Sequence, residues 1–86
     1  MRKALIPAPA KKIPLREIPI AATVLSETGV LPTLRSDRDL IIFEYDASDA
    51  VTSAISKYLS NGDVHVQDFF SAYKVLRTMM YSMKTR

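Results

Sequence analysis

The side chains that most often carry out chemistry in proteins are scarce in this sequence. It contains one histidine, His65, which stands between two valines, and it contains no cysteine. A zinc site or a proton relay needs several such groups, so His65 alone predicts neither a metal site nor an acid–base centre. Two glycines are also too few for a glycine-rich phosphate-binding loop.

Five acidic residues lie close together in the middle of the chain. They are Asp37, Asp39, Glu44, Asp46 and Asp49. Carboxylates can hold a divalent cation, but this group has neither the glycine pivot nor the ligand spacing of a calcium-binding loop. Turn formation and helix capping explain these acids better, and the pattern offers the serines no base that would activate them. We therefore expect a protein that is not an enzyme, with no cofactor and no metal.

The segment from Asp63 to Thr85 carries the pattern that the rest of the chain must accommodate. Five large side chains recur at intervals of four and three residues, which places them on one face of a helix: Phe69, Tyr73, Leu76, Met80 and Met83. A helix of this length cannot leave such a stripe in water, so the stripe predicts core or partner contacts.

A second stripe lies one step around the same helix and is both aromatic and basic. It consists of Phe70, Lys74, Arg77, Tyr81 and Lys84. Among the large apolar residues of this helix, we expect Phe70, Met79 and Tyr81 to be spare surface. The alternative is that they are ordinary core residues.

The elements that must position this helix are short. Pro19 suits the first residue of a helix that Gly29 ends in a left-handed conformation. Residues 31–35 and 40–45 predict two antiparallel strands around a four-residue turn, and Pro32 restricts the first to a short edge strand. A further helix follows, with N-cap oxygens from Asp46 or Ser48 and an end at residues 61–62.

These elements predict a small single α+β domain over residues 19–86, in the order helix, β-hairpin, helix, helix. A lone hairpin is barely stable. We therefore expect the sheet either to take Val64–Val66 as a third strand or to pair with a second copy in a homodimer.

Residues 1–18 predict an extended arm outside that domain. Prolines at 7, 9 and 14 remove backbone donors and favour polyproline geometry over regular structure. The arm is also basic, with Arg2, Lys3, Lys11, Lys12 and Arg16. It is either a disordered tail or a strap that lies along its own domain or a partner.

Charge is distributed unevenly along the chain. Residues 1–16 carry five cations and no acid, residues 17–73 have a net charge of −6, and residues 74–86 carry four cations. Basic ends suit a polyanionic partner, or they fold against the acidic middle of the same or a neighbouring chain. No apolar run is long enough to predict a membrane span, prolines and charges interrupt any signal-peptide core, and the absence of cysteine favours an intracellular, cytoplasmic setting.

From about Ile20 to Tyr81 the chain resembles a family of small bacterial and phage proteins of unknown function. The shared features are the helix that ends at Gly29, the strand LIIFEYD, and then Tyr58, Asn61-Gly62, Val66, Phe70, Leu76-Arg77 and Tyr81. The resemblance implies the order helix, hairpin, two helices and an association with phage or mobile-element genomes. It implies no catalytic residue and no activity.

Two interaction hypotheses follow. In the first, the protein is an adaptor, an inhibitor or a small assembly component that binds a protein partner or itself. In the second, it binds nucleic acid, since cations interleaved with aromatics suit phosphates and stacked bases. Both place the partner on the same residues of the last helix, aided by the arm cations: Phe70, Lys74, Arg77, Met79, Tyr81 and Lys84.

Overall fold

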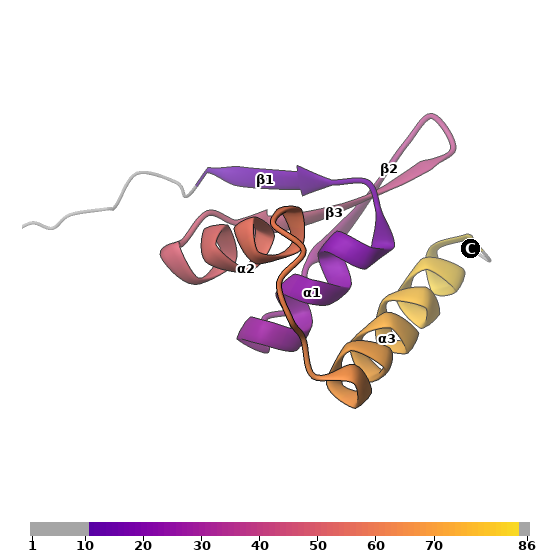
Figure 1. The fold of residues 1–86 in the computed structure, drawn as a ribbon. Helices are drawn as coiled ribbons and strands as arrows, with labels where there is room; N and C mark the ends of the chain where they lie inside the picture. The colour runs from indigo at the N-terminus through magenta and orange to yellow at the C-terminus, as the bar shows by residue number, and fades with distance from the viewer. Residues whose placement is uncertain (1–10, 85–86) are drawn as a thin grey trace, which may run out of the picture.

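A computed structural model describes residues 11–84, which form three strands and three helices (Figure 1). In chain order they are β1 (Lys12–Leu15), α1 (Ile18–Thr28), β2 (Thr33–Asp37), β3 (Leu40–Asp46), α2 (Asp49–Leu59) and α3 (Val66–Lys84). The predicted α+β class and the order helix, hairpin, helix, helix are confirmed, and β1 precedes them as an additional strand.

The sheet is antiparallel, with the strand order β1-β3-β2. Its third strand is therefore β1, and the expectation that Val64–Val66 supplies this strand is wrong because Val66 already begins α3. The expectation that the arm has no regular structure is also wrong for residues 12–15. Residues 1–10, with Arg2 and Lys3, lie outside the described residues.

Pro14 is compatible with a strand because β1 is an edge strand. Ile13 pairs with Tyr45 and Leu15 with Phe43, and the amide of Ala47 donates to the carbonyl of Lys11 at 2.7 Å. Hydrogen-bonded pairs alternate in an antiparallel ladder, so the nitrogen of Pro14 faces away from β3. Proline is tolerated there, and it leaves one donor fewer on the open edge.

The core lies between one face of the sheet and the helices. Phe43 and Tyr45 of β3 are almost fully buried, together with Ala21 and Val24 of α1 and Leu76 of α3. α1 lies between α2 and α3 (Figure 1). Its alanines 21 and 22 are fully buried, and their small size allows the neighbouring elements to approach closely. The Tyr45 hydroxyl donates to the carbonyl of Ala21 at 3.0 Å, which ties this helix to the sheet.

The face of the sheet opposite the helices is mostly polar, but one large apolar residue on it is buried. Ile42 is only 2% exposed although it points away from the helices. Arg35 is its partner across the β2–β3 ladder and pairs with Glu44 at 3.0 Å and with Asp37 at 3.9 Å. β3 is therefore buried on one side and partly covered on the other.

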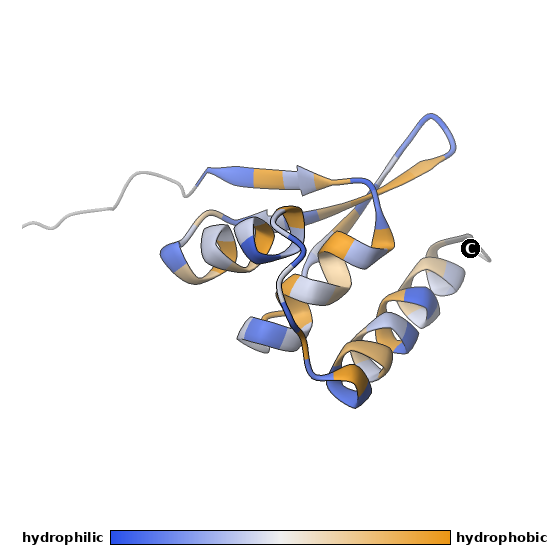
Figure 2. Cartoon of the chain, in the orientation of Figure 1, coloured by the Kyte–Doolittle hydropathy of each residue, from blue (hydrophilic) through white to orange (hydrophobic). Residues whose placement is uncertain are grey.

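Turn and cap residues explain where the elements end. Gly29 has φ 73° and ends α1, as predicted, while the hydroxyl of Ser48 accepts the amide of Val51 at 3.1 Å at the start of α2. Arg38 and Asp39 have φ of 52° and 70°, as a tight two-residue hairpin turn requires. This turn is the hydrophilic tip of the hairpin in Figure 2.

β2 begins one residue after Pro32, so the predicted strand over 31–35 is displaced to Thr33–Asp37. Pro32 itself is buried. A proline is poorly suited to a ladder, and here it stands just ahead of the strand.

Candidate interaction site

α3 turns its predicted core stripe toward the rest of the domain. Leu76 is fully buried at the centre of that stripe, and Phe69, Tyr73 and Met80 are half-buried and pack against the core. The predicted rotation of the helix is therefore confirmed. Ala72 is also buried. The predicted stripe did not include it because that stripe was defined by large side chains.

The second stripe faces away from the core. Phe70 is 59% exposed and Tyr81 is 56% exposed, and Lys74 and Arg77 are exposed between them. The stripe begins one turn earlier than predicted, because the exposed Val66 stands four residues before Phe70. That spacing was visible in the sequence. The side chain of Lys84, also predicted for this site, lies outside the described part of the chain.

Met79 does not belong to this exposed surface. It is half-buried and packs against the core, so the expectation that it is spare surface is wrong. The reason is its position three residues after Leu76, since residues three apart share a face of a helix.

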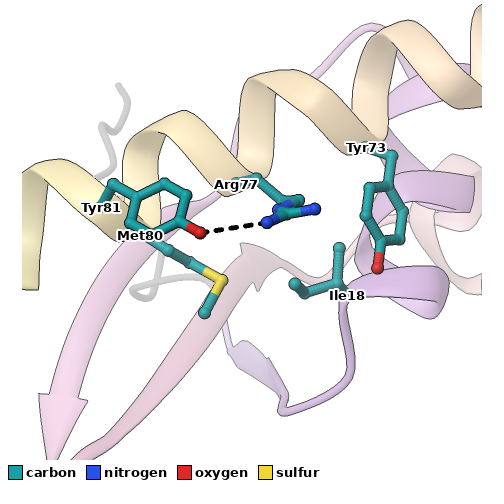
Figure 3. Close-up of a pocket in the computed structure, with 5 residues that line it drawn as sticks. All are labelled: Ile18, Tyr73, Arg77, Met80 and Tyr81. Carbon is teal, nitrogen blue, oxygen red and sulfur yellow. Dashed lines mark hydrogen bonds between the residues drawn. The ribbon is translucent and has the colours of Figure 1, made fainter.

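A shallow pocket opens where α3 passes the start of α1. It has a volume of about 250 Å³ and is lined by Ile18, Tyr73, Arg77, Met80 and Tyr81. Figure 3 shows the two tyrosines on either side of Arg77, with Ile18 and Met80 along the same opening. The sequence predicted Tyr73 and Met80 as core residues only, and it gave Ile18 no part in the site.

Arg77 is held by Tyr81, one turn further along the helix. Its Nη2 donates to the Tyr81 hydroxyl at 3.0 Å, and its Cζ lies 5.7 Å from the centre of the Tyr81 ring. The hydrogen bond to Tyr81 is the main cause of a pKa of Arg77 above its ordinary value, so the guanidinium stays charged. The contact fixes one end of the cation and leaves its other N–H groups to be used.

Arg77 and Lys74 differ from three other cations of the domain. Lys12 pairs with Asp46, Arg35 with Glu44 at 3.0 Å, and Lys57 with Glu27 at 3.0 Å. Within residues 11–84, by contrast, no carboxylate lies within 4.0 Å of the charged groups of Lys74 or Arg77. The exposed face of α3 therefore presents positive charge that this part of the chain does not neutralise.

None of the arm cations that the structure describes lines the pocket at Arg77. Lys12 is on β1, where its ion pair with Asp46 raises its pKa. Lys11 and Arg16 are exposed at the two ends of β1. The described residues contain nine Lys and Arg and nine Asp and Glu, so the net charge of this part is zero.

Other kinds of site find no support in the described part of the chain. No three metal-ligating side chains come together between residues 11 and 84. The backbone carbonyl of His65 accepts the amide of Phe69 at 2.9 Å, so this residue has a structural contact at the start of α3. None of the helices found there has both the length and the hydrophobicity to cross a bilayer.

The molecule is thus a small α+β domain with three helices on one face of a three-stranded sheet and an aromatic, basic stripe along its last helix. Residues 12–82 match a family described as a domain of unknown function, DUF5659, and the chain belongs to that family. The predicted membership of a small family of unknown function is confirmed. Neither the curated proteins nor the solved structures gave a match.

Proposed function

We propose that this protein is a small, non-enzymatic accessory protein of a phage or mobile element that acts by binding another protein. It serves as an adaptor, an inhibitor or a small assembly component in the cytoplasm of a bacterial host. The genomic setting rests on the resemblance in the sequence. The mode of action rests on one observation, the exposed stripe of Val66, Phe70, Lys74, Arg77 and Tyr81 along α3.

The composition of this stripe favours a protein partner. Aromatic residues and arginine dominate the energetically important positions of protein interfaces. Phe70 and Tyr81 leave more than half of their surface in water, although the helix had a buried face available for large side chains. Arg77 is already positioned by Tyr81, so little of its freedom is lost when a partner binds.

Nucleic-acid binding is the second candidate, and the same stripe supports it. Lys74 and Arg77 can meet phosphates, and Phe70 can stack on a base. Two observations make it the weaker candidate: the described residues have no excess of positive charge, and Lys12 of the arm is occupied by Asp46. Phosphate binding draws its affinity from many cations acting together.

Affinity capture from the native host with matched variants tests the proposal. The full-length chain is compared with the double variant Phe70→Ser, Arg77→Gln and with the control Leu59→Ser, Arg35→Gln. Leu59, at the end of α2, is 71% exposed, and the exposed Arg35 lies on the face of the sheet opposite the helices, so the control removes the same kinds of side chain from other surfaces. We expect one or a few proteins to be lost from the first variant and kept by the control. Equal capture by all three chains would refute a role for α3.

Two measurements address the remaining alternatives. DNA binding followed from about 50 to 200 mM salt should be weak and should disappear at the upper value. Tight binding at 200 mM that is lost in the triple variant Lys74→Ala, Arg77→Ala, Lys84→Ala would instead establish a nucleic-acid-binding protein. Light scattering of the full chain gives its mass, and a mass of twice 9.6 kDa would identify the homodimer that we expect as one form of self-association.

A further inference from the structure

We infer that the partner presents a short extended peptide segment that carries both Asp or Glu and large apolar residues on one face, and that this face lies along α3. A carboxylate binds Arg77, and an apolar side chain from the same face of the peptide enters the pocket beside it. This inference rests on the proposed function and specifies the chemistry of the partner.

The acidic character follows from the charge of the surface. Arg77 donates one N–H to Tyr81, and Lys74 stands one turn before it. Among residues 11–84, no carboxylate lies within 4.0 Å of the charged group of either residue. A guanidinium can bind a carboxylate through two parallel hydrogen bonds, which fixes the direction of the incoming group. Asp68 is the one acid within α3, and it stands in the first turn, away from Arg77.

The apolar character follows from the pocket. Its walls are the rings of Tyr73 and Tyr81 with the side chains of Ile18 and Met80, and Arg77 borders it (Figure 3). A volume of about 250 Å³ is below the range of about 300–1,000 Å³ that is usual for small-molecule sites. It is suited to one large side chain, and the flexible thioether of Met80 can adapt to its shape.

The length of the segment follows from a second hollow on the same helix. This one has a volume of about 470 Å³ and is lined by Gln67, Phe70, Ser71 and Lys74. It repeats the combination of an aromatic ring and a cation that has no carboxylate within 4.0 Å among residues 11–84. Phe70 and Tyr81 are eleven residues apart, which is about 16 Å along a helix. Because alternate side chains of an extended peptide share a face, a segment of about seven residues covers that distance and can offer an acid and an apolar side chain to each hollow.

A nucleic acid fits this surface less well than an acidic peptide. Its phosphates are closely and regularly spaced, whereas the described face offers two cations separated by one turn of helix. The pocket at Arg77 also has apolar walls and the half-buried ring of Tyr73, which suit a side chain better than a flat base.

Selection from a displayed library of random seven-residue peptides tests the inference directly, because it does not assume a sequence. The target is the full-length chain, and the variant Arg77→Gln and the control Arg35→Gln, on the face of the sheet opposite the helices, are run in parallel. We expect the enriched peptides to combine Asp or Glu with Leu, Ile, Phe or Met. An enriched peptide, synthesised and titrated, should bind Arg77→Gln about tenfold more weakly, because a charge-assisted hydrogen bond is lost. It should bind the control with unchanged affinity.

Three further titrations define the ligand. Replacing the acids of that peptide by Lys, or its apolar residues by Ser, should each abolish measurable binding. A twenty-residue oligothymidine should bind no more tightly than the serine peptide. The inference is overturned by enriched peptides without acids, by equal binding to Arg77→Gln, by the absence of any enrichment, or by tighter binding of the oligonucleotide.

These results are distinguishable from a failure of the proposed function. If no acidic peptide binds but the α3 double variant still loses a captured protein, the partner uses another chemistry and the proposed function stands. If the double variant captures everything that the control captures, the proposed function itself fails.

Discussion

Replacing Leu76 by alanine tests the part of the fold on which the rest of the interpretation depends. Leu76 is fully buried at the centre of α3 and belongs to the same core as Phe43 and Tyr45 of the sheet. If α3 were rotated by a quarter turn, Arg77 or Val75 would face the core and the exposed stripe would not exist. The substitution therefore measures the orientation of the candidate site as well as stability.

The expected loss can be worked out from the burial. Leu76→Ala removes three carbon atoms, and about 0.8 kcal/mol per buried methylene gives about 2.4 kcal/mol. The cavity that remains adds to this, so we expect a fall of about 3 kcal/mol in the free energy of unfolding, within the usual range of about 2–5 kcal/mol. A domain of this size has a stability of about 4–13 kcal/mol. The melting temperature should fall by roughly 12–24 °C.

Val75→Ala is the matched control, one residue away on the same helix. Val75 is 43% exposed, so the apolar contact that it loses is small. Alanine also has the higher helix propensity, by about half a kcal/mol, and this offsets part of the loss. We expect a change of less than about 0.5 kcal/mol. Urea unfolding followed by circular dichroism gives both values. Equal losses for the two variants, or a loss below about 1 kcal/mol for Leu76→Ala, would show that α3 is rotated differently.

Three further predictions concern the sheet and the turns. Burial raises the pKa of Tyr45, so above about pH 10 the unfolded chain releases a proton that the folded chain keeps, and the free energy of unfolding should fall by up to about 1.4 kcal/mol per pH unit. Urea unfolding at several pH values should show a shallower fall in Tyr45→Phe, and an unchanged slope would contradict the assignment. Gly29→Ala should destabilise by about 1 kcal/mol because the residue has φ 73°, although no atom within 4 Å would obstruct the added methyl group; a variant as stable as the parent would argue against the left-handed end of α1. The double variant Arg38→Asn, Asp39→Gly should raise the melting temperature, because these residue types favour the positive φ of both turn positions; a lower melting temperature would exclude this turn.

The sequence predicted α3 well because its pattern is long and its two faces differ in chemistry. Leu76 and Phe70 were assigned to opposite environments from spacing alone, and the structure agrees. Met79 was misassigned because a large apolar residue beside the stripe was taken as surplus. Its distance of three residues from Leu76 was the stronger signal.

The sequence did not predict β1, because Pro14 is evidence against a strand although apolar residues alternate around it. Ile13 and Leu15 face the core on either side of Pro14, which is the pattern of a strand with one buried face. A proline is tolerated where its nitrogen faces away from the neighbouring strand. Whether it does so depends on the register in which that strand pairs. The residues that pair with β1 lie 28 to 34 positions further along the chain, so the local sequence cannot reveal this orientation.

The pocket could not be predicted for a related reason. Ile18 reaches it because α1 begins directly after β1, and the place of β1 in the sheet was itself unknown from the sequence. The stripe, in contrast, is a property of one helix and could be listed in advance. Local patterns therefore predict which residues are exposed together, whereas packing between distant segments decides whether they border a cavity.

The outward direction of Arg77 follows from the burial of Leu76. Leu76 and Arg77 are adjacent in sequence, and a helix separates adjacent side chains by about 100°. Burial of Leu76 therefore turns Arg77 outward without any further contact, and the hydrogen bond to Tyr81 then sets the direction of the guanidinium. Removing Leu76 disturbs both fold and site, whereas removing Arg77 disturbs the site alone. Arg77→Gln should accordingly leave the urea midpoint of the protein unchanged, which makes it a clean probe of binding.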